Sequence, residues 1–209
     1  MKISWRRDGD MARLIFYDSR HEYTVDGEKY PSVSEILRFI SREIYDDTNQ
    51  YALDHAANRG TSVHKATENI DRYGSADIED EYAGYVQAYV SFLREHDVIW
   101  SDIEKPMYHP VKHYAGTIDR FGVVDGFNTL VDIKTNATIK KPLVKAQLNG
   151  YEDMRQANEM TPAERLCCLQ LKSDGTYRMY PCAVDMTEFD ACYALHTALA
   201  RKQKRGEIE

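Results

Sequence analysis

Hydrophobic residues recur along the chain with two different periods, and each period predicts one kind of element. Alternation of hydrophobic and polar residues predicts strands, and turns are expected where Asp, Asn and Gly cluster at 26–27, 125–128 and 173–175. The predicted strands cover residues 12–17, 21–25, 103–108, 115–124, 129–135, 166–172 and 177–182. Three consecutive strands therefore lie in the middle of the chain, and two more lie near its end.

A spacing of three to four residues between hydrophobic positions predicts helices around these strands. The predicted helices cover residues 35–40, 49–71, 79–96 and 140–158, and a last helix begins near 187. Ser32 or Ser34 is a candidate cap for the first helix and Thr187 for the last. Gly60 is expected to bend the second helix or to mark a close approach. This order predicts an α/β (α+β) protein in which helices flank a mixed sheet.

The composition is that of a soluble globular protein, with 43% hydrophobic and 29% charged residues. No internal repeat or Pro/Gly-rich linker divides the chain, so we expect one domain over residues 1–209. Its parts would be an N-terminal hairpin and helix at 1–47, a helical part at 48–100 and an αβ core at 101–209. The sequence has no apolar stretch of roughly 20 residues and no apolar signal segment, which predicts a cytoplasmic protein without a membrane partner.

The four cysteines lie in the last quarter of the chain, at Cys167, Cys168, Cys182 and Cys192. They form no Cys-x-x-Cys pair and lack a matching histidine spacing, so a zinc or iron–sulfur site is not expected. We expect buried, reduced thiols on a strand and a helix.

Charge is distributed unevenly, although the net charge of −7 does not by itself favour a phosphate-rich partner. Residues 71–104 contain nine acidic and two basic residues, whereas residues 133–151 contain four lysines and no acid. Those lysines are Lys134, Lys140, Lys141 and Lys145. A second basic segment follows at 201–205. The lysines could grip a phosphate backbone, and a solvated lysine face on a helix is the alternative.

Two aspartates and a lysine on the middle strands are candidates for chemistry. Asp132 and Lys134 share one face of their predicted strand because side chains alternate. Asp119 lies on the preceding strand at a similar distance from the turn, so the hairpin can place it beside Asp132. Two converging carboxylates repel unless a cation separates them, and a hard ion such as Mg²⁺ or Mn²⁺ suits oxygen ligands. A surface ion pair is the alternative for these residues.

Four motifs in this order resemble those of the PD-(D/E)XK nuclease superfamily, in its RecB-like or phage-exonuclease branch. Residues 116–119 (Gly-Thr-Ile-Asp) match the family's Gly-x-x-Asp motif, and residues 132–134 (Asp-Ile-Lys) match Asp/Glu-x-Lys. Residues 147–151 match Gln-x-x-x-Tyr, and residues 60–64 match an upstream Gly-x-x-x-His helix. The resemblance covers nearly the whole chain and implies a restriction-endonuclease-like core with N-terminal additions.

The resemblance also implies a role for each matching residue. Asp119, Asp132, His64 and the backbone carbonyl of Ile133 would bind the metal, and Lys134 would be the catalytic lysine. Gln147 and Tyr151, one helical turn apart, would reach the phosphate or the lysine. The iron–sulfur staple of some RecB-like members is not expected, because it needs a cysteine upstream of the core.

Further residues near these motifs have two interpretations each. Glu104 could approach a second metal, or it could form an ion pair with Lys105 on an edge strand. Arg59 and Lys65 flank His64 and could contact phosphate, although salt bridges are the commoner fate of such residues. His64, Gln147 and Tyr151 could serve packing or solvation alone.

The sequence therefore predicts a metal-dependent DNA nuclease, an exonuclease of phage recombination type that acts on linear DNA. It would act alone, as a homo-oligomer or with a phage recombination partner, because no ATP-binding loop is present. One alternative is a non-catalytic nucleic-acid- or protein-binding module that retains the fold. Another is a structural or inhibitory phage protein that acts through its acidic segment at 71–104.

Overall fold

The structure is a computed structural model, and it describes residues 12–17, 20–45 and 50–207. The N-terminal residues, on which the expectation about a signal segment rests, lie outside these ranges. The central sheet contains β4 (Val98–Tyr108), β5 (Ala115–Val124), β6 (Phe127–Lys134), β7 (Arg165–Leu171) and β8 (Tyr177–Cys182). These strands lie side by side in chain order, and every neighbouring pair is antiparallel except β6 and β7. The predicted mixed sheet is confirmed.

A second, smaller sheet is formed by β1 (Leu14–Tyr17), β2 (Glu22–Val25) and β3 (Glu28–Tyr30). The predicted turn at Asp26–Gly27 is present, with φ angles of 52° and 86° that favour glycine and small polar residues. Strand β3 was not predicted from the sequence, because three residues are too few to show an alternating pattern.

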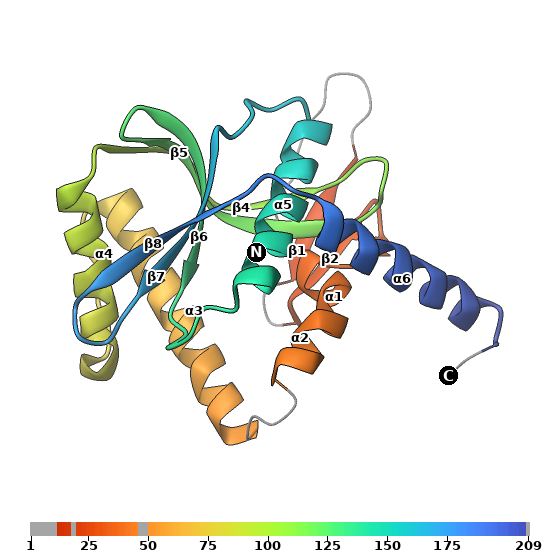
Figure 1. Cartoon of the computed structure of the whole chain (residues 1–209), viewed down its shortest axis with the longest axis horizontal. Coiled ribbons are helices and arrows are strands. Elements are labelled where there is room, and N and C mark those ends of the chain that lie inside the picture. Colours follow the sequence, from red (N-terminus) through yellow and green to blue (C-terminus); the bar gives the residue numbers. More distant parts are fainter. Residues whose placement is uncertain (1–11, 18–19, 46–49, 208–209) are drawn as a thin grey trace.

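Helices cover both faces of the central sheet (Figure 1). They are α1 (Val33–Ile36), α2 (Arg38–Tyr45), α3 (Gln50–Tyr73), α4 (Ala83–Glu95), α5 (Lys141–Ala157) and α6 (Thr187–Lys204). A 3₁₀ turn at Asp80–Tyr82 precedes α4. One face packs under α3 and α4, and the other under α5, which connects the parallel strands β6 and β7. None of the described helices combines the length and apolar character needed to cross a membrane.

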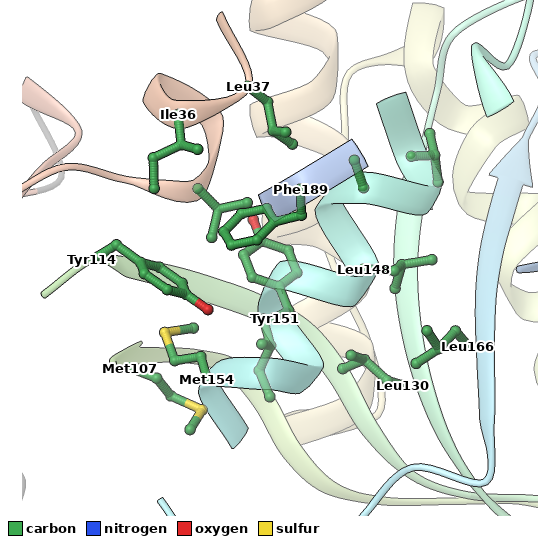
Figure 2. Close-up of a cluster of buried hydrophobic side chains, with 14 of the residues drawn as sticks. Ile36, Leu37, Met107, Tyr114, Leu130, Leu148, Tyr151, Met154, Leu166 and Phe189 are labelled. Atoms are coloured by element: carbon green, nitrogen blue, oxygen red, sulfur yellow. The ribbon is translucent and has the colours of Figure 1, made fainter. Parts of the chain in front are cut away.

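Two hydrophobic clusters lie on opposite faces of the sheet, and they show toward which face each strand residue points. Val131 and Ile133 of β6 pack toward α3 and α4. Leu130 of β6 and Leu166 of β7 pack under α5, where Leu148 and Phe189 complete the cluster shown in Figure 2. The alternation predicted for β6 is therefore confirmed, and Asp132, between Val131 and Ile133, points toward the α5 side.

Several predicted element boundaries are corrected by the structure. Strand β4 begins at Val98, five residues before the predicted start at 103, because a register shift between Trp100 and Asp102 breaks the alternating pattern. Gly122 makes this bulge possible, since a Cβ there would collide with the Ile99 carbonyl. The first helix begins at Val33 and is divided at Leu37 into α1 and α2.

Two predictions about helix interiors and ends were also wrong in detail. Helix α3 runs through Gly60 without interruption, and no atom approaches the space where its Cβ would lie. A single glycine costs roughly 1 kcal/mol in a helix, which a long packed helix can absorb. Thr187 does not cap α6; Asp185 Oδ1 accepts both its N–H at 3.0 Å and its hydroxyl at 2.6 Å. Ser32 does cap α1, in a reciprocal capping box with Glu35.

Candidate active site

The candidate site lies where β5 and β6 separate. These strands pair from Val124 opposite Phe127 to Arg120 opposite Val131, and the pairing stops before Asp119 and Asp132. Strand β6 nevertheless stays paired with β7 on its other side as far as Lys134. Asp119 fills the gap between the separated strands, because its Oδ2 accepts a 2.7 Å hydrogen bond from the Ile133 N–H. The hairpin therefore brings the two predicted aspartates to the same end of the sheet.

His64 and Glu104 approach Asp119 from the side of α3 and β4. The three side chains each offer a ligand atom, and these atoms lie within 4.8 Å of one another. The His64 Nδ1 atom lies 3.2 Å from Glu104 Oε1 and 3.7 Å from Asp119 Oδ1. Its Nε2 atom lies 3.1 Å from the carbonyl oxygen of Ile133. Two carboxyl groups and one backbone carbonyl predicted to bind the metal thus lie around the His64 imidazole, itself a predicted ligand.

The backbone at Glu104 is strained. Its φ angle of 43° lies in the left-handed region, which costs a non-glycine residue about 1–3 kcal/mol. In the register of β4 and β5, where Ile103 faces Arg120 and Lys105 faces Ile118, Glu104 stands opposite Asp119. Two carboxylates in facing positions repel each other. Strain and repulsion at one position indicate that the fold holds these acids together at a cost in stability.

Asp132 and Lys134 form the opposite, α5-facing part of the site. The Lys134 ammonium lies 2.9 Å from both carboxylate oxygens of Asp132, and the contact with Oδ1 is a hydrogen bond. Asp132 Oδ2 is buried without a hydrogen-bond partner among the described residues. Asp132 does not belong to the group formed by His64, Glu104 and Asp119, whose ligand atoms lie within 4.8 Å of one another. In this structure the second aspartate is therefore paired with the lysine rather than grouped with the other acids.

Burial and mutual charge change the acidity of these groups. Burial lowers the pKa of His64, but the charge of Asp119 and the hydrogen bond to Glu104 outweigh it and raise that pKa to about 9. Burial raises the pKa of Asp119, and it raises the pKa of Asp132 to about 6 against the opposing pull of Lys134. Burial disfavours the Lys134 ammonium, yet Asp132 and Asp119 raise its pKa. At neutral pH the His64 imidazolium and the Lys134 ammonium thus offset the clustered negative charge. A bound cation could offset this charge in the same way.

Arg120, directly after Asp119, lies fully buried behind the site. Its guanidinium donates to Glu104 Oε1 at 2.9 Å, to the Asp119 carbonyl at 2.7 Å and to Thr67 Oγ1 at 3.1 Å. Its Nε donates to Asp71 Oδ2 at 2.6 Å. Arg120 therefore ties β5 to α3 and fixes one oxygen of Glu104.

The buried Asp71 beneath Arg120 has two further partners. The Tyr89 hydroxyl donates to it at 2.7 Å, and the Trp100 indole N–H donates to that hydroxyl at 3.1 Å. This network was not predicted from the sequence. Its one signal was an arginine and an aspartate side by side within an otherwise hydrophobic strand, a pattern that fits surface residues equally well.

Tyr151 and Gln147 of α5 lie beside the aspartates, and they contact each other. The Gln147 amide donates to the Tyr151 hydroxyl at 3.0 Å. Burial, together with the charges of Asp132 and Asp119, raises the pKa of Tyr151 well above its usual value. A Cβ at Gly116 would lie 2.7 Å from the Tyr151 ring, so only glycine allows α5 to come this close to β5. This close approach gives a physical reason for a glycine three residues before Asp119.

The residues predicted to contact nucleic acid differ in their surroundings. Lys145 pairs with Asp185 at 2.6 Å and with Glu188 at 2.9 Å. Lys65 pairs with Glu68 at 2.9 Å. These ion pairs offset the positive charge of both lysines locally.

The other basic candidates differ in exposure. Lys141 is exposed at the start of α5, next to Lys140. The Arg59 guanidinium packs over Tyr85 and donates to Thr135 Oγ1 at 3.3 Å, one residue beyond Lys134. The residues of the C-terminal basic segment at 201–205 are exposed at the far end of α6, which extends away from the sheet (Figure 1).

Comparison with known proteins supports the fold. Neither a protein-family profile nor the sequence of a curated protein matches the chain. A solved structure named as a candidate exonuclease, from Eubacterium rectale, is similar with a TM-score of 0.50. It is 14% identical, and the match covers 74% of this chain and 69% of that one. An alkaline exonuclease from Laribacter hongkongensis matches over 85% of this chain and 93% of its own, at 16% identity and a TM-score of 0.40.

Proposed function

We propose that this protein is a metal-dependent deoxyribonuclease with the PD-(D/E)XK arrangement of residues, in which the whole chain forms one nuclease domain. The observation that carries the proposal is the grouping of His64, Glu104 and Asp119, with the Ile133 carbonyl in contact with His64 and with Lys134 paired to Asp132 at the same end of β6. The likeness of the fold to the Eubacterium rectale protein is consistent with this proposal. The finer assignment is an exonuclease of phage recombination type acting on linear DNA.

The residues at the site fit a divalent cation. Carboxylates, one imidazole and a backbone carbonyl are donors that Mg²⁺ and Mn²⁺ accept. Asp132 Oδ2 is a buried oxygen without a hydrogen-bond partner in the described part of the chain, and the carboxyl groups of Glu104 and Asp119 stand opposite each other. A cation between two such carboxyl groups relieves their repulsion. Asp119, Asp132 and the Ile133 carbonyl would hold the ion, with His64 as a further ligand and Glu104 near it or near a second ion. A bound ion would polarise the phosphate and lower the pKa of a water molecule.

The chain's own groups would then position the substrate and stabilise negative charge. Lys134 remains an ammonium because Asp132 and Asp119 raise its pKa, so it orients the attacking water or donates to a phosphate oxygen rather than accepting a proton. Gln147 and the protonated Tyr151 hydroxyl present hydrogen-bond donors from α5 to the same region. Lys140 and Lys141 would bind the backbone phosphates without reading bases.

The decisive experiment compares end-labelled linear DNA with closed circular DNA, incubated with the protein in Mg²⁺, Mn²⁺ or EDTA. We expect metal-dependent degradation of the linear DNA only, and loss of that activity in Lys134→Ala with the fold preserved. Lys172→Ala, which removes an exposed lysine from the β7–β8 turn, is the matched control. Binding without degradation in any metal would favour a non-catalytic module. If the protein neither binds nor degrades DNA but forms a stoichiometric complex with a protein partner, the structural or inhibitory role would be favoured.

A further inference from the structure

A cavity of about 490 Å³ opens between the first turns of α5 and the strands β7 and β8, beside the candidate site. Its floor is formed by Cys168 and Tyr180, and apolar residues of α5 and its preceding loop line one wall. Lys141 and Arg178 stand at its rim, and both are exposed. A volume of this size is in the range of pockets that bind small organic ligands, roughly 300–1,000 Å³.

The register of the sheet connects this cavity to the candidate site. Asp132 pairs with Cys168, and Cys168 pairs with Tyr180, so one row of side chains runs from the site to the cavity floor. The next row runs from Lys134 through Gln170 to Arg178. Neighbouring strands lie about 4.8 Å apart, which places Tyr180 about 10 Å from Asp132. This distance suits a nucleotide next to the scissile phosphate.

Tyr180 is held in a fixed position. Its hydroxyl donates to Gln170 Oε1 at 3.1 Å, and the amide of the buried Gln170 in turn donates to the carbonyls of Asn136 and Ala137. The hydrogen bonds of Gln170 therefore link Tyr180 to the loop before α5. Two cations lie over its ring, since the Arg178 guanidinium carbon is 4.8 Å and the Lys141 nitrogen is 5.9 Å from the ring centroid.

We propose that this cavity binds a nucleobase of the substrate strand, which displaces the exposed Lys141 or Arg178 side chain from the Tyr180 ring and stacks there, while these cations bind the adjoining phosphate. A fixed aromatic ring beside cations is the combination with which proteins bind single-stranded nucleic acid without reading its sequence. Asp185 and Glu188 offset the charge of Lys145 in the lining, so the preference for an anionic ligand comes from the exposed Lys141 and Arg178. This inference rests on the proposed nuclease function and names a subsite for it.

Two kinds of variant test the subsite without touching the candidate catalytic residues. Tyr180→Leu removes the stacking ring, and Tyr180→Phe keeps it. The double variant Lys141→Ala with Arg178→Ala removes two exposed cations and should leave the folded core intact. Tyr73→Leu is the matched control, because Tyr73 is 75% exposed at the end of α3.

The first readout is binding of a fluorescein-labelled 12-nucleotide DNA, in single- and double-stranded form, measured by anisotropy in EDTA. Because Tyr180→Leu removes one stacking ring, it should weaken binding roughly 5- to 100-fold, whereas Tyr180→Phe and Tyr73→Leu should bind like the parent protein. Removing the two cations should reduce the slope of log Kd against log salt on a single strand by about 0.7 for each phosphate that they neutralise. Equal affinity of parent and Tyr180→Leu, with equal melting temperatures, would overturn the subsite.

The second readout is cleavage of linear DNA that carries one abasic residue at successive positions from the end. If a base occupies the cavity, an abasic residue at one particular position should raise KM for the parent protein. In Tyr180→Leu, an abasic residue at that position should no longer change KM. Cleavage by the parent with no such position, or with the same position effect in Tyr180→Leu, would overturn the subsite but leave the nuclease proposal standing. Failure of the parent protein to bind or cleave any DNA would overturn both.

Discussion

Replacing the buried Arg120 by methionine should destabilise the protein more than any other single change near the site. The guanidinium is 0% exposed and pairs with the buried Asp71 and with Glu104, and it also donates to Thr67. Burial raises the pKa of Asp71, and Arg120 and Tyr89 offset that effect only in part. Arg120→Met leaves the buried Asp71 without its counter-charge and leaves Glu104 with His64 as its remaining charged partner.

The expected loss is about 3–5 kcal/mol of unfolding free energy, the usual cost of removing one partner from a buried ion pair. The free energy is measured by urea denaturation at neutral pH in EDTA. Arg94→Met is the matched control on α4, because Arg94 is exposed and a surface change of this kind shifts stability by about 0.5 kcal/mol or less. Asp71→Asn in the same chain should restore part of the loss in Arg120→Met, since it removes the unpaired charge.

A double-mutant cycle on Arg120 and Asp71 then gives their coupling energy, which we expect to exceed about 1 kcal/mol for groups in one network. If Arg120→Met costs no more than Arg94→Met, or if the two changes add without coupling, the buried network does not hold Glu104 and α3 as described.

Four further predictions concern the acidity and metal affinity of the site, the packing of α5 and the capping of α1. In EDTA, His64 should stabilise the protein fully below pH 6.5, because its pKa is higher in the folded state, and this stabilisation should disappear as the pH rises through about 9. The measurement is the melting temperature of the parent and of His64→Gln as a function of pH. Melting temperatures that follow each other at every pH would contradict the prediction. The same protonation should make Mn²⁺ affinity rise with pH up to about 9, and calorimetry that finds a pH-independent affinity would exclude His64 as a ligand. Gly116→Ala should cost about 1–3 kcal/mol, because its Cβ meets the Tyr151 ring at 2.7 Å, and an unchanged urea midpoint would show that α5 can move away without cost. Ser32→Ala should cost about 0.5–2 kcal/mol because it removes the α1 cap, whereas Ser34→Ala, at the other candidate position, should cost less; equal urea midpoints for the two variants would contradict this.

Much of the fold could be predicted because its signals are local. Alternation along β5 and β6, the Asp–Gly turns and the periodicity of α5 depend on neighbouring residues alone. The relative position of Asp119 and Asp132 also followed from the sequence, although the turn predicted at 125–128 is shorter: Asp125 and Gly126 form it, and its length sets the register of the hairpin. The strand boundary that was wrong, at Val98, depends on a bulge. The start of α6 at Thr187 was predicted correctly, but its cap was not, because Asp185, a residue outside the helix, accepts the Thr187 N–H.

Contacts between distant segments could not be predicted. The grouping of His64 with Glu104 depends on how α3 crosses β4, and no local pattern encodes that crossing. The burial of Arg120 depends on an aspartate 49 residues away. The left-handed backbone of Glu104 is equally invisible in the sequence, because glutamate does not favour that conformation. Partners of this kind are found only when the whole chain is folded.

The central claim is that the acids at the open end of β5 and β6 share a divalent cation. An anomalous difference map from a crystal of the protein soaked in Mn²⁺ tests it most directly. We predict a peak in contact with Asp119, Asp132 and the Ile133 carbonyl, and disappearance of that peak in Asp119→Asn. A map without a peak at this position at saturating Mn²⁺, or with the ion bound elsewhere on the chain, would contradict the proposed hydrolytic function.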